Sequence, residues 1–174
     1  MIHLQMEALS LIYARSINYC IGAGGRVPWE LPDEYALFER TTRNHAIIMG
    51  RASWEDHRTT LPDRLNIVVT SRPAAAFSKG IRVARSLPEA LSLARSSNLA
   101  PFVIGGTRLL AEAMPLTTRV FETIVDVEVE GDTYVDAFDF TGWHASVVDQ
   151  RGIDANNRYA WTTRRYQKPM PKET

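Results

Sequence analysis

One carboxylate in this sequence, Glu34, is predicted to lie on the buried face of a helix, where an ionised side chain is unusual. Glu34 follows Pro32, and a proline suits the first turn of a helix because its fixed φ fits and its missing N–H needs no partner there. The spacing predicts a helix over 31–43, with one inward face formed by Leu31, Glu34, Tyr35, Phe38, Thr41 and Thr42. Burial among apolar neighbours favours a neutral carboxyl, and such groups are candidates for ligand binding or acid/base catalysis.

A structural interpretation of the same residues stays open. Asp33 and Glu34 both lie in the first turn of the predicted helix, where acidic side chains complement the positive end of the helix dipole. This explains Asp33 well, because Asp33, Leu37 and Arg40 project away from the face that carries Glu34. For Glu34, periodicity alone does not choose between the two interpretations.

The segment before this helix, residues 21–29, contains three glycines and ends in a Pro-Trp pair. A mobile backbone that leads to a rigid aromatic anchor is typical of a lid over a pocket, although an ordinary connection has the same composition. The dinucleotide fingerprint G-x-G-x-x-G does not fit, because Val27 stands at the third glycine position and Pro28 follows it.

Two other glycine sites each follow a predicted strand and open a predicted helix, at residues 50–53 and 105–108. Backbone N–H groups at helix starts can bind phosphate oxygens, and glycine lets the ligand approach closely. Either glycine site alone could be a tight strand-to-helix turn. Two such sites in one small sheet favour a dinucleotide.

The elements that must position these residues alternate between short apolar strands and helices. The predicted strands are 8–14, 46–49, 65–70, 81–84 and 102–104, and the predicted helices are 31–43, 51–58, 86–96 and 107–113. After residue 119 the pattern changes to strands, at 119–127, near 133, 143–150 and 158–166. We expect an α/β fold with a mixed, mostly parallel central sheet of about eight strands, flanked by helices and ending in an antiparallel edge.

The composition restricts the class of protein. The chain has 174 residues, 45% of them hydrophobic, and no linker or repeat divides it, so we expect a single domain over 1–174 with an N-terminal extension at 1–7 and a C-terminal tail at 167–174. Lys plus Arg and Asp plus Glu both number 20, which favours neither nucleic acid nor a membrane surface as a partner. The N-terminus lacks a signal-peptide pattern, so we expect a cytoplasmic protein. One cysteine, Cys20, and four scattered histidines predict neither an intramolecular disulfide nor a metal site.

Several short motifs occur in one order along the chain. They are Ile21-Gly22, Pro28-Trp29, Leu31-Pro32 with Glu34 and Phe38, Ile48-Met49-Gly50-Arg51 with Trp54-Glu55, Leu61-Pro62 with Arg64 and Asn66, Ile104-Gly105-Gly106, and Glu130-Gly131-Asp132-Thr133. In these motifs the chain resembles the dihydrofolate reductase family, over roughly residues 8 to 166.

The resemblance implies a dihydrofolate reductase-like fold, NADPH as cofactor and 7,8-dihydrofolate as substrate. The matching cofactor-binding positions are Ala14, Ile21, Gly24, Val27, Gly50, Arg51, Ala52, Ser53, Val69, Thr70, Ser71, Arg72, Arg85, Ile104, Gly105, Gly106, Thr107, Arg108 and Leu109. The matching substrate-binding positions are Ile12, Ala14, Glu34, Tyr35, Phe38, His57, Leu61, Arg64, Ile104 and Thr123. Guanidinium and hydroxyl groups at residues 51, 70–72 and 85 would favour NADPH over NADH, because they can bind the extra 2′-phosphate.

The resemblance also implies the reaction: hydride transfer from the nicotinamide C4 to C6 of dihydrofolate, with a proton delivered to N5. Glu34 would orient the pterin with support from Thr123, and a water near Trp29 would carry the proton, so that Glu34 and Trp29 are the expected catalytic residues. Arg64 would hold the carboxylate of the glutamate tail, and residues 23–27 would close over the nicotinamide. The Gly105-Gly106 peptide is expected to be cis. We further expect a monomer that binds antifolate inhibitors and needs no metal.

One departure from the family pattern bears on activity. The family usually has a tyrosine near the nicotinamide at the position of Leu110, and its loss removes a polar group beside a developing positive charge. Two alternatives therefore stay open. The first is a related pterin reductase or the riboflavin-pathway reductase branch, against which Trp29, Glu34, Phe38 and Arg64 argue together. The second is a non-catalytic paralogue that binds NADPH or a pterin.

Overall fold

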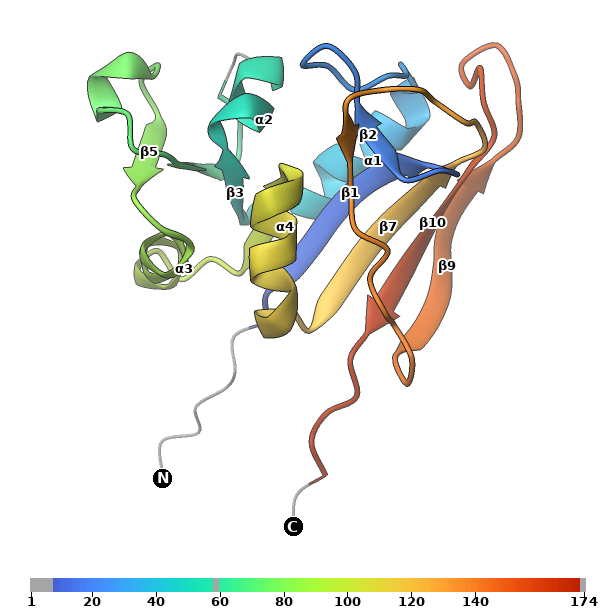
Figure 1. Cartoon of the computed structure of the whole chain (residues 1–174). Helices are drawn as coiled ribbons and strands as arrows, with labels where there is room; N and C mark the ends of the chain where they lie inside the picture. Colours follow the sequence, from blue (N-terminus) through green and yellow to red (C-terminus); the bar gives the residue numbers. More distant parts are fainter. Residues whose placement is uncertain (1–7, 58–59, 173–174) are drawn as a thin grey trace.

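In the computed structural model, residues 8–57 and 60–172 are described, and a central sheet of eight strands runs through this part of the chain (Figure 1). In sheet order the strands are β5 (Ile81–Ala84), β4 (Leu65–Val69), β3 (Ala46–Gly50), β6 (Pro101–Gly105), β1 (Ser10–Ser16), β7 (Arg119–Val125), β10 (Trp161–Gln167) and β9 (His144–Arg151). The pairs from β5 to β7 are parallel, whereas β10 is antiparallel to both β7 and β9. The predicted mixed sheet with an antiparallel C-terminal edge is confirmed.

The helices fall close to their predicted positions. They are α1 (Pro32–Thr42), α2 (Arg51–His57), α3 (Leu87–Ser96) and α4 (Thr107–Ala113), with 3₁₀ turns at Ala74–Ala76 and Met114–Leu116. A second sheet of two strands pairs β2 (Cys20–Gly22) with β8 (Thr133–Tyr134). The expected N-terminal strand over 8–14 begins later, at Ser10, and continues to Ser16. The expected extension at 1–7 and the end of helix 51–58 lie outside the described residues.

Two apolar layers cover the central sheet, one on each face. One layer contains Leu11 of β1 together with side chains of α3 and α4, and the other contains Ile12 together with Phe38 of α1 and Trp54 of α2. Figure 1 shows α4 in front of the sheet and α1 behind it. Because successive strand residues point to opposite faces, each inner strand supplies both layers, as expected for a parallel sheet covered on both sides.

Helix α1 is buried along two stripes, whereas the sequence predicted one. Leu37, which we expected to project away from the inward face, is buried against Val125 and Trp161 of β7 and β10. Tyr35, which we expected to face inward, is 41% exposed. The helical periodicity shows that Leu37 and Glu34 lie on different sides of the helix. It could not show that the β9–β10 hairpin covers the side that carries Leu37.

Polar contacts along the second stripe fix the helix on this hairpin. The amide Nδ2 of Asn157, which is fully buried in the β9–β10 connection, donates to Asp33 at 2.9 Å. The indole Nε1 of Trp161 donates to the amide oxygen of Asn157, also at 2.9 Å. Further along α1, Arg40 pairs with Asp149 of β9 at 3.2 Å. Asp33 therefore has a specific partner in addition to the helix dipole.

Candidate active site

Glu34 projects from the first turn of α1 towards β7. It accepts a hydrogen bond from Thr123 of that strand, whose hydroxyl is also hydrogen-bonded to the hydroxyl of Thr163 on β10. Although some of the residue is accessible, burial of its carboxyl raises the pKa of Glu34 from 4.5 to about 7, and the Thr123 hydrogen bond opposes this rise only in part. Near neutral pH the carboxyl is thus present both protonated and ionised, as acid/base catalysis requires.

The apolar residues predicted around the substrate lie together beside this carboxyl. Ile12, Phe38, Leu61 and Ile104 belong to one cluster, contributed by β1, α1, the loop before β4, and β6. Phe121, which the sequence did not single out, belongs to the same cluster because it is the partner of Ile12 in the β1–β7 pairing. Finding it requires the strand register, which the sequence does not reveal.

Tyr35 extends the apolar wall towards solvent. Its ring centroid is 5.8 Å from that of Phe38, one turn along α1. Ala14 lies two residues after Ile12 on β1 and pairs with Thr123, so it is level with the Glu34 carboxyl. The structure therefore brings together the predicted substrate residues for which side chains are described; the side chain of His57 lies outside the described part.

Arg64 is held against the end of α1. Its Nε donates to the hydroxyl of Thr42 at 2.8 Å, and Nη2 and Nη1 donate to the carbonyl oxygens of Glu39 and Pro62, each at 2.6 Å. Asn66, buried at the start of β4, exchanges hydrogen bonds with both backbone polar groups of Leu61. These contacts fix the loop at 61–65 and place a guanidinium at the rim of the apolar cluster.

The two glycine turns predicted to bind phosphate lie against each other. A Cβ added to Gly50 would lie 3.6 Å from the amide nitrogen of Gly106, and one added to Gly105 would lie 3.0 Å from Oγ of Ser53. Gly105 has a φ of 137°, and its peptide bond to Gly106 is cis, as expected. The starts of α2 and α4 thus form one surface at the carboxyl ends of β3 and β6, and both the positive φ and the nearby Ser53 hydroxyl disfavour a larger residue at Gly105.

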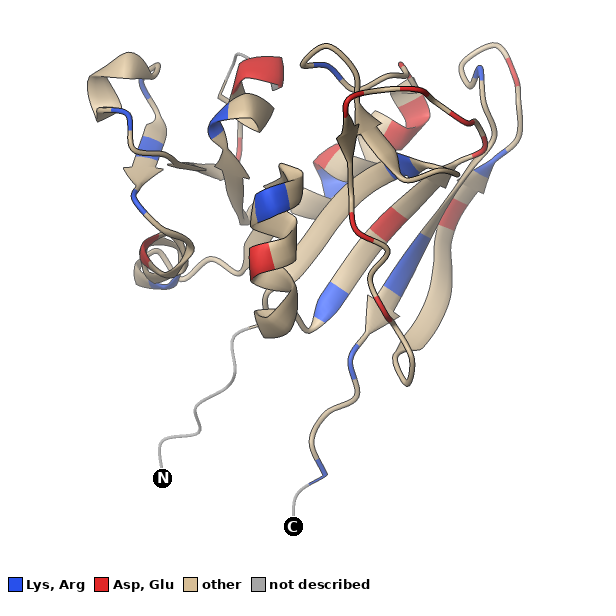
Figure 2. Ribbon diagram, in the orientation of Figure 1, with Lys and Arg blue, Asp and Glu red and all other residues tan. Residues whose placement is uncertain are grey.

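The arginines predicted to surround a 2′-phosphate also gather, and two of them flank the carboxylate of Glu55. Arg51 pairs with Glu55 at 2.7 Å, one turn along α2, and Arg72 lies 3.9 Å from the same carboxylate. Nη1 of Arg85 donates to the carbonyl oxygens of Thr70 and Arg72. Figure 2 shows basic residues along β5 and its flanking turns, both basic and acidic residues on α2, and acidic residues along the loop after β7. The local field on the α2 and β5 side favours an anion.

The glycine-rich segment forms a tight hairpin. Ala23 and Arg26 exchange backbone hydrogen bonds at 2.9 and 3.3 Å, and the two glycines between them have φ values of 62° and 79°, the sign that a type I′ turn requires. The amide of Gly24 donates to Asp132 at 3.0 Å, and this hydrogen bond is the main cause that lowers the pKa of Asp132. Val27, at the end of the hairpin, is 48% exposed.

Gly131, in the loop after β7, packs against β2, and the sequence did not show this role. A Cβ at Gly131 would lie 2.3 Å from the carbonyl oxygen of Gly22 and 2.5 Å from Sγ of Cys20, closer than any side chain allows. Glycine at this position is therefore required for β2 and the loop after β7 to meet. The next residue, Asp132, holds the hairpin, so the close approach also positions that carboxylate.

The remaining predicted residues divide between the site and the core. Trp29 precedes α1, five residues before Glu34, and packs against the cluster that contains Leu31 and Trp161. Ile21 packs against the layer under α3 and α4, and Leu109 and Leu110 are buried in that layer. Leu110 is completely inaccessible, so its side chain is part of the core layer.

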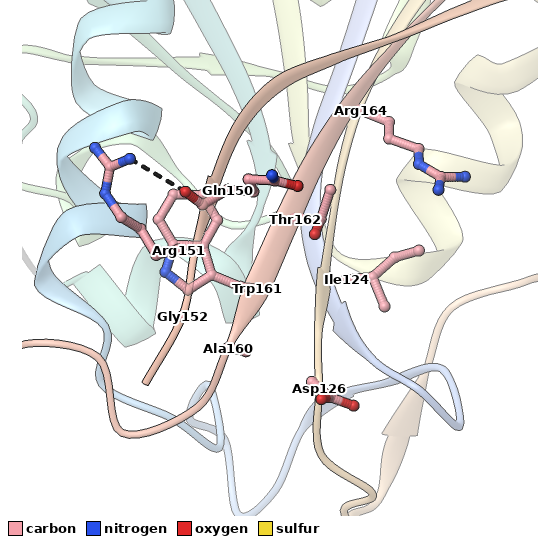
Figure 3. Close-up of a pocket in the computed structure, with 9 residues that line it drawn as sticks. All are labelled: Ile124, Asp126, Gln150, Arg151, Gly152, Ala160, Trp161, Thr162 and Arg164. Atoms are coloured by element: carbon pink, nitrogen blue, oxygen red, sulfur yellow. Dashed lines mark hydrogen bonds between the residues drawn. The ribbon is translucent and has the colours of Figure 1, made fainter. Parts of the chain in front are cut away.

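A shallow groove of about 500 Å³ lies along the antiparallel side of the sheet (Figure 3). It follows the edge formed by β7, β10 and β9, and its lining residues include Ile124, Gln150, Thr162 and Arg164. None of the predicted substrate or cofactor residues lines it. In the described part of the chain no helix is long and apolar enough to cross a membrane, and no group of metal-binding side chains is found.

A dinucleotide surface at the carboxyl ends of parallel strands, next to an apolar cluster with one buried acid, is an arrangement typical of α/β enzymes that use nucleotide cofactors. Comparison with known proteins is more specific. Residues 8–168 match the family model described as dihydrofolate reductase. The chain belongs to the dihydrofolate reductase family.

Individual relatives agree over almost their whole length. The dihydrofolate reductase of Neisseria meningitidis serogroup B is 39% identical over 158 residues, which are 90% of this chain and 96% of the relative. The dihydrofolate reductase of Bacillus subtilis is 36% identical over 160 residues, with 92% and 94% covered. Among solved structures, the dihydrofolate reductase from Enterococcus faecalis complexed with NADP(H) and RAB-propyl superposes with a TM-score of 0.82 at 29% identity, and covers 93% of this chain and 96% of that one.

Proposed function

We propose that this protein catalyses the NADPH-dependent reduction of 7,8-dihydrofolate to 5,6,7,8-tetrahydrofolate. The observation that carries the proposal is the Glu34 carboxyl, whose pKa of about 7 lies near physiological pH, at the edge of the apolar cluster around Phe38. Family membership over residues 8–168 supports the same reaction.

NADPH fits the residues present. Gly50 and Gly105 leave the backbone open at the junction of α2 and α4, where a larger residue at 105 would meet Ser53. The basic group of Arg51, Arg72 and Arg85 offers charge-assisted hydrogen bonds to a phosphate near the start of α2. When bound, NADPH supplies the hydride that is transferred to C6 of the substrate.

Glu34 orients the pterin and controls its protonation. Thr123 binds one side of the carboxyl, and the remaining oxygen is available for the amino group and ring nitrogen of a pterin. Because the neutral form of Glu34 persists up to about pH 7, a proton is available for N5, and we propose that it passes through a water near Trp29. Apolar neighbours exclude bulk water and strengthen these contacts.

Arg64 is the proposed partner of the glutamate tail of the substrate. Its fixed position beside Thr42 lets the guanidinium meet a carboxylate with little loss of side-chain entropy. The hairpin at 23–26 is the proposed lid, which moves over the nicotinamide and is held by the Gly24–Asp132 contact when closed. We further propose a single domain that acts as a monomer in the cytoplasm and binds antifolate inhibitors at the Glu34 site.

Leu110 is the observation that favours a second candidate, a paralogue that binds NADPH and a pterin without turnover. Its buried side chain supplies no dipole to a developing positive charge. A riboflavin-pathway substrate, a ribosylaminopyrimidine phosphate, would instead need an anion site beside Glu34, where the cluster around Phe38 is apolar.

The experiment is to incubate the purified protein with NADPH and either 7,8-dihydrofolate or a ribosylaminopyrimidine phosphate, and to identify the products. We expect tetrahydrofolate and NADP⁺ in equal amounts with dihydrofolate, and slower oxidation with NADH. Reduction of the ribosylaminopyrimidine alone would assign the chain to the other branch. Tight binding of both ligands by folded protein without any product would establish the non-catalytic candidate.

A further inference from the structure

A buried polar cluster lies on the opposite side of the sheet from Glu34. Arg15, Glu122 and Tyr13 are 8%, 4% and 7% exposed, respectively. Glu122 accepts hydrogen bonds from the Tyr13 hydroxyl at 2.8 Å and from Nε of Arg15 at 3.1 Å. None of the three is a predicted substrate or cofactor residue, and the proposed reaction does not use them.

Stability alone is a poor explanation for this cluster. Removing two charges from water costs more than their attraction usually returns, and apolar replacements of buried ion pairs are often as stable or more stable. The location is more informative. Tyr13 pairs with Glu122 across β1 and β7, and the next pair in the register is Ala14 with Thr123, which binds Glu34.

The guanidinium of Arg15 reaches beyond the ion pair to the turn that follows β1. Its Nη1 donates to the carbonyl oxygen of Ser16 at 3.0 Å, and its central carbon lies 3.9 Å from the centroid of the Tyr19 ring. The same carbonyl oxygen accepts the amide of Tyr19 at 3.1 Å, which closes the turn. Arg15 therefore contacts both ends of the turn at 16–19.

Tyr19 itself has a strained backbone. Its φ of 66° lies in the left-handed region, which a bulky side chain rarely adopts unless its surroundings impose it. The surrounding contacts are the Arg15 guanidinium on its ring and the amide of Val135 on its carbonyl oxygen, at 2.9 Å. The chain then runs through β2 directly into the glycine hairpin at 23–26.

We propose that Arg15 is a positioning residue for this hairpin, and that Glu122 holds Arg15 in place. Arg15 fixes the turn from which the hairpin starts, while Asp132 holds its tip at Gly24. Loss of the Arg15 contacts leaves the sheet intact and lets the hairpin open more often. The consequence for NADPH binding rests on the proposed function; the consequence for hairpin opening does not.

The test uses a double substitution, Arg15→Leu with Glu122→Val, which replaces the ion pair by apolar side chains. Arg26 is exposed at the hairpin, so the rate of tryptic cleavage after it, followed by mass spectrometry without ligands, reports opening. Loss of one cation–π contact and one hydrogen bond should raise this rate by about tenfold. The KM for NADPH should rise more than kcat falls.

Tyr13→Phe is the matched control, since it removes one buried hydroxyl from the cluster and leaves the contacts of Arg15 in place. It should cleave at the rate of the unmodified protein. If the double variant does not fold, Tyr19→Asn tests the same contact, because asparagine tolerates a positive φ but removes the ring beneath Arg15. It should also cleave about tenfold faster.

Unchanged cleavage after Arg26 in the folded double variant, or in Tyr19→Asn, would overturn the proposal. Equal acceleration in Tyr13→Phe would also overturn it, because general loosening of the core would then explain the result. Failure of the unmodified protein to oxidise NADPH with dihydrofolate would refute the proposed function alone, since the cleavage measurement involves neither ligand.

Discussion

Replacing Glu34 by glutamine should raise the stability of the folded protein and lower its catalytic rate. Glutamine keeps the volume and removes the charge. The pKa of Glu34 rises from 4.5 to about 7 on folding, and at roughly 1.4 kcal/mol per pH unit the ionised form is disfavoured by about 3 kcal/mol. Since the folded protein holds this proton more tightly than the unfolded chain, wild-type stability falls as pH rises from 4.5 to 7.

Glu34→Gln should therefore be more stable than wild type at pH 8, by about 1–3 kcal/mol once its weaker bond to Thr123 is included. The difference should nearly vanish at pH 4.5, where both side chains are mostly neutral. Urea denaturation at the two pH values measures it, with dihydrofolate turnover at neutral pH expected to fall by roughly 10²–10⁴. A variant less stable than wild type at pH 8 would refute the argument that the carboxyl is desolvated.

The control is Asp33→Asn, on the neighbouring stripe of α1. Asp33 accepts a hydrogen bond from buried Asn157, so its replacement should cost about 1 kcal/mol of stability. Turnover should stay near that of the unmodified protein, because Asp33 faces the β9–β10 hairpin rather than the apolar cluster. Loss of turnover in this variant, with normal turnover in Glu34→Gln, would reverse the assignment of the catalytic carboxylate.

Three other regions give separate predictions. Arg51→Gln should raise the KM for NADPH about tenfold and leave the KM for NADH nearly unchanged. The control Arg82→Gln, at an exposed position on β5, should change neither KM. Equal effects of Arg51→Gln on both cofactors would show that Arg51 does not contact the 2′-phosphate. Asn66→Ala should lower the free energy of unfolding by about 2–3 kcal/mol in urea, since it leaves both polar groups of Leu61 without their buried partner, and a smaller loss would mean that water replaces the amide. Gly131→Ala should lower stability by about 1–3 kcal/mol and raise the KM for NADPH, because its Cβ would collide with Gly22; wild-type values for both would show that the loop gives way freely.

Much of the fold could be predicted because the local sequence patterns of strands, turns and helices agree with their positions in the sheet. The apolar runs of β3 and β6 are buried on both faces, and the glycines that follow them turn directly into helices. The arginines at residues 51, 72 and 85, which the resemblance placed around a phosphate, lie near one another, and their role in binding stays a prediction. The ion pair between Arg51 and Glu55 could also have been predicted from sequence, because Arg and Glu four residues apart on a helix commonly pair.

The remainder depends on contacts between distant segments. Phe121 joins the apolar cluster through the β1–β7 register, and Glu122 meets Arg15 across 107 residues of sequence. The two buried stripes of α1 differ from the predicted single face because the β9–β10 hairpin, more than a hundred residues later, covers Leu37. Periodicity shows which side chains share a face, but tertiary packing decides which faces are buried.

The pH dependence of kcat/KM for dihydrofolate is the most direct test of the central claim, that the desolvated Glu34 carboxyl controls reduction. In the unmodified protein, with saturating NADPH, kcat/KM should be constant at low pH and fall as pH rises through about 7, following the pKa of Glu34. Glu34→Gln should give a low value without this transition. A transition near 7 that persists in Glu34→Gln, or a flat profile in the unmodified protein, would contradict the account.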